Sequence, residues 1–270
     1  MTQPIDFAYR AQARPARVRG GRTWRAVALV LAFWWAATGV LIALQRSAGS
    51  RVGALVLTLV AAPLGLWLVV RARRAWTERA AVASFFGGAL LWTAVSAAFY
   101  GGWVVGPTIG APRAGDALAR ATDAIVATSY STVFAAALLL TAVLATRRAP
   151  NRLGILTFAS FWAAHELAKL NVFAGVLSPG VHFLPDYLGH LQRYFGPARN
   201  SALLPASVAL LTGSGVALLV RARRDGDPGR RLGAVLLAAL LLLAALEHAL
   251  LGSPRDLGWW NAFLAWRELR

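Results

Sequence analysis

Hydrophobic residues in this chain fall in long blocks that are separated by short polar segments. A block of about 20 apolar residues, at 1.5 Å rise per residue, matches the roughly 30 Å hydrocarbon core of a bilayer. The pattern predicts seven transmembrane helices, over residues 24–44, 52–70, 80–105, 122–145, 153–177, 201–220 and 232–251. The expected fold class is therefore all-α, a polytopic integral membrane helix bundle.

Composition agrees with a membrane protein. Hydrophobic residues make up 58% of the chain and charged residues 14%, with a mean hydropathy of +0.56, whereas a soluble domain is about 25% charged. The sequence has no cysteine, which excludes disulfides, thiolate metal sites and cysteine nucleophiles within it. The net charge of +17 would suit a nucleic-acid partner. Because nearly all basic residues lie between the apolar blocks, they indicate topology and no nucleic-acid partner is expected.

The arginines are unevenly divided between the two sides of the predicted bundle. The N-terminal arm and the segments after the second, fourth and sixth blocks hold eighteen arginines, and the alternate segments hold nine. Basic residues concentrate in cytoplasmic loops. The division predicts a cytoplasmic N-terminus and an outer C-terminus.

The same pattern divides the chain into three parts. Residues 1–23 form a basic arm, expected to be disordered and attracted to anionic lipid, residues 24–251 the seven-span domain, and residues 252–270 an aromatic C-terminal tail. Two outer segments, 185–195 and 256–269, are amphipathic but too short to cross a bilayer. Both are predicted to be helices in the outer interface, although a partner-binding helix would give the same pattern. In the sixth span, Ala209, Gly213 and Ala217 form a small-residue face that would let another helix approach closely.

No catalytic signature is present. The chain lacks the zinc-protease, nucleophile-elbow, phosphate-loop and dinucleotide-binding motifs, and no two of its four histidines are spaced as an obvious metal pair on one helix. We therefore expect a protein that is not an enzyme.

The candidate chemistry is a set of ionisable residues inside two apolar blocks. His165, Glu166 and Lys169 lie on the fifth span, and Glu247 and His248 on the seventh. Such residues are costly in a bilayer and usually face the protein interior. One interpretation is a local Glu166–Lys169 pair that neutralises itself. The other is a helix–helix lock or a site for a partner or a pigment, in which His165 or His248 would bind the magnesium of bacteriochlorophyll.

Depth along the helices suggests a specific pairing. Lys169 lies about 24 Å along the fifth span and Glu247 about 22 Å along the seventh, in the same direction. Because an unpaired charge in the membrane is costly, we expect these two spans to be neighbours. Lys169 should then face Glu247 or His248 within about 6 Å, with the local Glu166 pair as the alternative.

One stretch resembles a known family. "LGILTFASFWAAHELAKLNVFAGV" and "HFLPDYLGHLQRYFGPARNSALLPASVALLT" resemble the core of the photosynthetic complex assembly protein 2 family, the PuhE-type proteins of phototrophic bacteria. The resemblance covers roughly 153–212, with a weaker match at 240–266. Two departures stand out: His165 occupies a position that is usually arginine, and Leu177-Ser178 replaces a proline-asparagine pair. The matching elements are Ala168–Asn171, Phe173, Gly175–Val176, Phe183–Pro185, Leu188–Phe195, Asn200, Leu204–Val208 and Ala244–His248.

The resemblance implies a role in assembling the reaction centre and light-harvesting complex in a bacterial cytoplasmic (inner) membrane. The partners would be membrane lipid and the polypeptides of those complexes, with Lys169, Glu166, Glu247 and Asn171 as the intramembrane site. A carrier or transporter of a pigment or pigment precursor is the alternative, and a stable subunit of the mature complex is a third. A carrier needs a cavity that reaches the charged residues, whereas a scaffold should have a closed core and an exposed small-residue or aromatic face.

Overall fold

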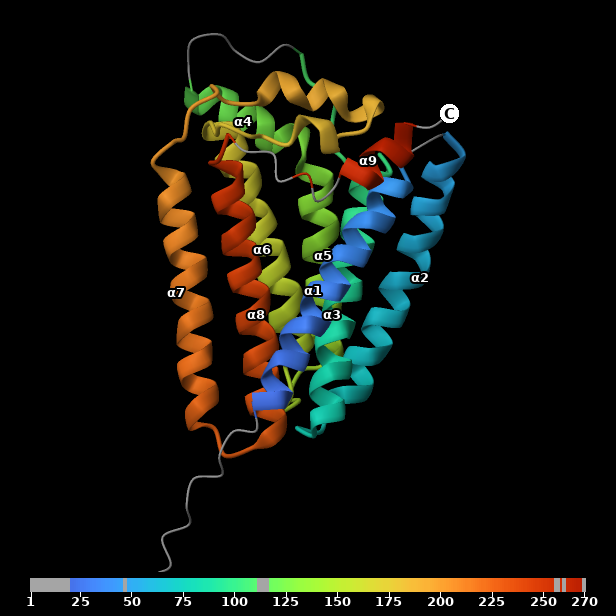
Figure 1. Cartoon of the computed structure of the whole chain (residues 1–270). Coiled ribbons are helices and arrows are strands. Elements are labelled where there is room, and N and C mark those ends of the chain that lie inside the picture. Colours follow the sequence, from blue (N-terminus) through green and yellow to red (C-terminus); the bar gives the residue numbers. More distant parts are fainter. Residues whose placement is uncertain (1–19, 46–47, 111–116, 255–257, 259–260, 269–270) are drawn as a thin grey trace, which may run out of the picture.

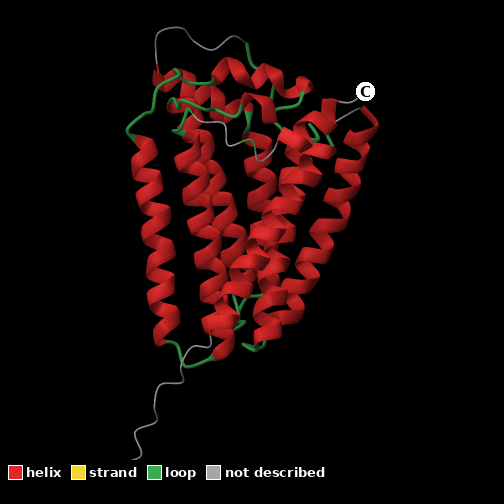
Figure 2. Cartoon of the chain, viewed as in Figure 1, coloured by secondary structure: helices red, strands yellow, loops and turns green. Residues whose placement is uncertain are grey.

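The computed structural model describes residues 20–45, 48–110, 117–254, 258 and 261–268, and within them every regular element is helical (Figure 2). The elements are α1 (Gly20–Ala43), α2 (Ala48–Ala72), α3 (Glu78–Tyr100), α4 (Ala117–Ala127), α5 (Ser129–Ala145), α6 (Leu153–Ala174), η1 (Val181–Phe183), η2 (Asp186–Tyr194), α7 (Leu203–Arg224), α8 (Pro228–Leu251) and α9 (Asn261–Glu268). Residues 1–19 of the predicted basic arm lie outside the described residues, and residues 20–23 begin α1.

Five helices, α1, α2, α3, α7 and α8, are long and apolar enough to cross a membrane. A sixth candidate is the pair α4–α5, which meets at an angle of 60°. Helix α6 has 22 residues but is less apolar, because its second half carries the ionisable residues. The all-helical membrane architecture is confirmed. That α6, the fifth predicted span, also crosses the membrane stays a prediction.

The predicted span limits need three corrections. The third span was expected to reach residue 105, but α3 ends at Tyr100 and a turn follows, in which Gly102 has φ +73°. The fourth was expected to be continuous over 122–145, but it breaks at Thr128. The fifth was expected to reach residue 177, but α6 ends at Ala174, and Gly175 has φ +118°. Glycine adopts positive φ without steric cost, which explains both turns.

Helix α3 lies at the centre of the bundle and is its most buried helix. A Cβ on Gly88 would lie 2.2 Å from the carbonyl oxygen of Gly154, and one on Gly87 would lie 2.9 Å from that of Gly65. These contacts let α2 and α6 pack backbone against backbone on α3. Such close approach needs small residues and is typical of membrane helix interfaces.

The two ends of the bundle hold different segments of the chain (Figure 1). One end holds the arginine-rich loops between α2 and α3, α5 and α6, and α7 and α8. The other end carries α4, α9 and the segment between α6 and α7, which crosses the helix ends. All arginine-rich loops described in the structure thus lie at one end, as the sequence predicts.

The amphipathic segment 185–195 forms η2, a 3₁₀ helix over Asp186–Tyr194. Its apolar residues Leu188, Leu191 and Tyr194 are buried against Phe99, Ala124, Ala127 and Phe173. The apolar face therefore packs on α3, α4 and α6, where the sequence analysis had expected lipid. The second amphipathic segment, 256–269, is described as a helix only over Asn261–Glu268, where α9 packs near α1.

Candidate functional site

Helix α6 places its ionisable residues on two sides. Glu166 and Lys169 contact α5, whereas His165 contacts the aromatic rings of α3. Residues one apart on a helix point about 100° away from each other, which separates His165 from Glu166. Residues three apart lie on the same side, which brings Glu166 and Lys169 together.

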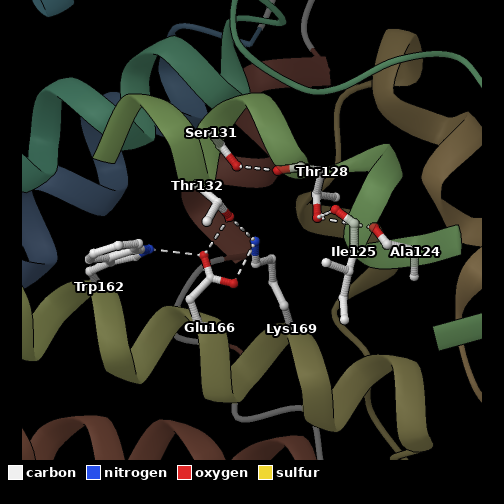
Figure 3. A network of polar contacts seen from close by, with 8 residues as sticks. All are labelled: Ala124, Ile125, Thr128, Ser131, Thr132, Trp162, Glu166 and Lys169. Carbon is white, nitrogen blue, oxygen red and sulfur yellow. Dashed lines mark hydrogen bonds and ion pairs between the residues drawn. The ribbon is translucent and has the colours of Figure 1, made fainter. Parts of the chain in front are cut away.

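Glu166 is the centre of a polar cluster between α5 and α6 (Figure 3). Its Oε2 lies 2.8 Å from the ammonium of Lys169. Its Oε1 accepts hydrogen bonds from Trp162 Nε1–H and from the hydroxyl of Thr132, each at 3.1 Å. The same Thr132 hydroxyl accepts a weak bond of 3.5 Å from Lys169. The carboxylate therefore has a charge partner and two donors, as a buried charge requires.

The break between α4 and α5 lies beside this cluster. The hydroxyl of Thr128 donates to the carbonyl of Ala124 at 3.1 Å, and that of Ser131 donates to the carbonyl of Thr128 at 2.7 Å (Figure 3). Serine and threonine side chains satisfy backbone groups that a helix break frees inside a membrane. The next residue, Thr132, then points at Glu166.

The predicted neighbours are confirmed, but the predicted pair is wrong. Helices α6 and α8 do pack together. Glu247 on α8 nevertheless accepts its hydrogen bond from Trp34 Nε1–H on α1, at 2.5 Å. Lys169 takes Glu166 as its ion-pair partner, because the i,i+3 spacing brings that carboxylate within reach without any helix rearrangement. The only indication of the Trp34 contact in the sequence is that this tryptophan lies in the middle of the first predicted span.

His165 lies among aromatic rings. Its ring centroid is 5.1 Å from that of Trp92 and 6.2 Å from that of Phe99. Among the described residues, its nitrogens have no hydrogen-bond partner. The side chain is surrounded by protein, and yet part of its surface remains accessible because it lines a cavity.

His248 is held differently. Only 2% of its surface is exposed, and its Nδ1 lies 2.8 Å from the carbonyl oxygen of Ala244. Because a carbonyl only accepts, Nδ1 carries the proton and Nε2 keeps a lone pair. Nε2 is buried without a partner. The two candidate pigment histidines therefore differ in access.

Asn171, the remaining residue of the predicted site, joins helices. Its amide donates to the carbonyl of Leu167 at 2.8 Å and to the hydroxyl of Ser207 on α7 at 2.9 Å. Asn200 plays a similar part, because it accepts from Leu177 N–H at 3.1 Å and donates to the carbonyl of Gly252 at 2.9 Å. These two asparagines of the resembling stretch fix the ends of α6, α7 and α8 to one another.

A cavity of about 550 Å³ lies between α1, α3, α6 and α8. It occupies the half of the bundle that is farther from the arginine-rich loops, and the segment between α6 and α7 contributes to its wall. Its aromatic lining consists of Phe33, Trp34, Trp92, Phe99, Tyr100, Phe161, Phe173, Phe183 and Phe195. Its ionisable lining consists of His165, Lys169, His182, Glu247 and His248. The volume falls within the roughly 300–1,000 Å³ of small-molecule sites, which are mostly apolar with a few polar groups.

The cavity brings together four of the six predicted site residues, His165, Lys169, Glu247 and His248. Glu166 lies beside it in the polar cluster, and Asn171 belongs to the α6–α7 contact. Sequence analysis missed the aromatic wall, because the residues that form it lie on α1, α3, α6 and the segment between α6 and α7, and a linear pattern does not show which sides of these elements face one another. Within the described part of the chain, no three His, Asp or Glu side chains are placed to hold a bare metal ion.

No solved structure matches this chain. A Rhodobacter capsulatus protein, described as the uncharacterized 30.4 kDa protein in the puhA 5' region, is 41% identical over 98 residues, or 36% of each chain. The match therefore spans about a third of that relative's length. Residues 21–266 match the family described as Protein of unknown function (DUF3623), and the chain belongs to that family.

Proposed function

We propose that this protein is a seven-span factor of a bacterial cytoplasmic membrane that assists assembly of the photosynthetic apparatus and carries out no catalysis. The observation that carries the proposal is the relative in the puhA 5' region. It agrees with the resemblance of residues 153–212 to the PuhE-type assembly proteins. Both point to the same biological context independently of any site chemistry.

In this proposal α6 also crosses the membrane, which brings the number of spans to seven, and the N-terminus is cytoplasmic. The arginine-rich loops at one end of the bundle support that orientation. The Glu166–Lys169 pair supports a membrane position for α6, because it neutralises the two charges that make this helix less apolar.

The protein would act through helix faces that contact reaction-centre or light-harvesting polypeptides. Helix α7 packs closely on α8 through Gly215, whose added Cβ would meet Leu242 at 2.8 Å. Its opposite side carries Ala209, Gly213 and Ala217, which are exposed, and a Cβ on Gly213 would meet nothing within 4 Å. A small-residue face of this kind lets a partner helix approach closely in a bilayer.

The test is copurification of a tagged protein from a phototrophic bacterium in mild detergent while the photosynthetic complexes are being made. We expect reaction-centre or light-harvesting polypeptides in substoichiometric amounts. Gly213→Ile should weaken this copurification, whereas Ala136→Ile, at an exposed position on α5, should not. Absence of these polypeptides from the wild-type eluate would refute the proposal, and a constant stoichiometric ratio would identify a stable subunit.

The cavity favours a second candidate, a carrier of a pigment or pigment precursor. A scaffold needs no internal space beside ionisable residues, whereas a carrier does. A carrier should leave the membrane with a bound small molecule even when every partner polypeptide has been removed. A protein that is free of ligand under those conditions would oppose this candidate.

A further inference from the structure

His165 and Glu247 face one cavity. The side chain of His165 is partly accessible and that of Glu247 is exposed. They line the cavity from α6 and α8. A molecule in the cavity would therefore contact both.

Two side chains on this wall, His165 and Glu247, present electron pairs without a described partner, whereas the ammonium of Lys169 on the same wall is paired with Glu166. The imidazole of His165 has ring contacts to Trp92 and Phe99, and no hydrogen bond among the described residues. A neutral imidazole always presents one nitrogen lone pair. Glu247 uses Oε1 to accept from Trp34, which leaves its second oxygen free of any described partner. The site thus suits a ligand with an electron-pair-accepting centre.

The surroundings decide which kind of accepting centre fits. A bare metal ion needs three or more protein ligands, and the described residues offer no such group. A metal held in a macrocycle already has its equatorial ligands, so the protein must supply only one axial ligand. The apolar, aromatic lining suits the flat face of such a ring.

We propose that the cavity binds a tetrapyrrole that holds a metal ion, with His165 as the axial ligand of the metal. This inference rests on the carrier as the function of the site. His248 also lines the cavity but is the poorer axial ligand, because its lone-pair nitrogen, Nε2, is buried and not accessible. Glu247, which lines the same cavity, accepts a hydrogen bond from an N–H or O–H group of the ligand.

The first test is binding of magnesium protoporphyrin IX to the purified full chain in detergent, with metal-free protoporphyrin IX as the matched probe. The magnesium form should bind at least about tenfold more tightly, equivalent to about 1.4 kcal/mol. His165→Leu should abolish that difference, and His165→Gly with added imidazole should restore it. Magnetic circular dichroism then reports nitrogen ligation of the metal. Equal binding of both probes would refute axial ligation, and binding of neither would refute a tetrapyrrole site.

The second test uses the cavity volume. Ala168 lines the cavity and Ala163, on the same helix, is exposed and does not. Ala168→Phe should abolish binding of both probes, whereas Ala163→Phe should leave it unchanged. Binding that survives Ala168→Phe would place the ligand elsewhere and overturn the proposal. His165→Leu should still copurify with photosynthetic polypeptides, so failure of the ligand site and failure of the assembly function are distinguishable.

Discussion

Replacing Lys169 by methionine tests which carboxylate neutralises the intramembrane ammonium. Methionine keeps most of the side-chain length and removes the charge. Lys169 is 12% exposed and Glu166 32% exposed, and their charged atoms are 2.8 Å apart. In the variant, the Glu166 carboxylate retains only its hydrogen bonds from Trp162 and Thr132.

The expected loss follows from what the carboxylate retains. Removing one partner of a buried pair costs about 3–5 kcal/mol when the other charge is left uncompensated. Here, the two retained hydrogen bonds and the partial exposure of Glu166 reduce the cost, and we expect Lys169→Met to lower the free energy of unfolding by about 2 kcal/mol. Adding Glu166→Gln removes the stranded charge and keeps an acceptor for both donors. The double variant should therefore regain about 1 kcal/mol.

The assay is reversible unfolding in mixed micelles of a mild detergent and dodecyl sulfate, followed by tryptophan fluorescence and far-ultraviolet circular dichroism. The matched control is the double variant Glu247→Gln with Lys169→Met, which should show no recovery because Glu247 is bonded to Trp34. Recovery in this control but not in the Glu166 double variant would show that Lys169 is paired across the α6–α8 interface. That result would refute the local pair.

Three further predictions concern packing, topology and the outer surface. Gly154→Ala would place a Cβ 2.5 Å from Val69 and should lower the free energy of unfolding by about 1–3 kcal/mol. Gly213 has open space around it, so Gly213→Ala should change that free energy by less than about 0.5 kcal/mol in the same assay. Alkaline phosphatase fused after Arg74, Arg148 or Arg231 should be inactive, because the arginine-rich loops are predicted to be cytoplasmic. Phosphatase activity at any of these three positions would overturn the orientation. Tyr187→Phe removes the hydrogen bond to the Tyr100 carbonyl and should cost about 1 kcal/mol. Burial raises the pKa of the Tyr187 phenol, so the contribution of this group to the free energy of unfolding should hold below about pH 10 and fall above it. If Tyr187→Phe lost the same stability as the wild type above that pH, the reasoning would be contradicted.

Hydropathy located the membrane helices well because it depends only on length and apolarity. It failed where local side-chain chemistry ends or breaks a helix. The glycine pair after Tyr100 is a turn signal inside an apolar run, and the turn ends α3 although the run continues. The break at Thr128 has neither proline nor glycine. It rests on hydroxyl groups that bond freed carbonyls, which no hydropathy pattern records.

Sequence reasoning picked out residues that line the cavity, but it did not give how these residues pair. Depth along the helices placed Lys169 and Glu247 at similar levels, and both do line one cavity. Depth does not give the rotation of a helix about its axis. That rotation turns Glu166 toward Thr132 and leaves Glu247 to the indole of Trp34. Two candidate pigment histidines looked equivalent in sequence, and only the packing around each ring separates them.

The position of the cavity follows from how the size of side chains changes along α3 and α6. Near the arginine-rich end, Gly88 and Gly154 let the two backbones touch. Toward the other end, α3 and α6 carry the bulky rings of Phe99 and Phe173 instead, and these rings line the cavity together with His165. Ionisable groups cost most at the bilayer centre and less toward the surface. Lys169 lies five residues before the end of α6, about 8 Å at 1.5 Å per residue. The end of the bundle that contains the cavity is therefore also the end where ionisable residues in a cavity wall cost the fold least.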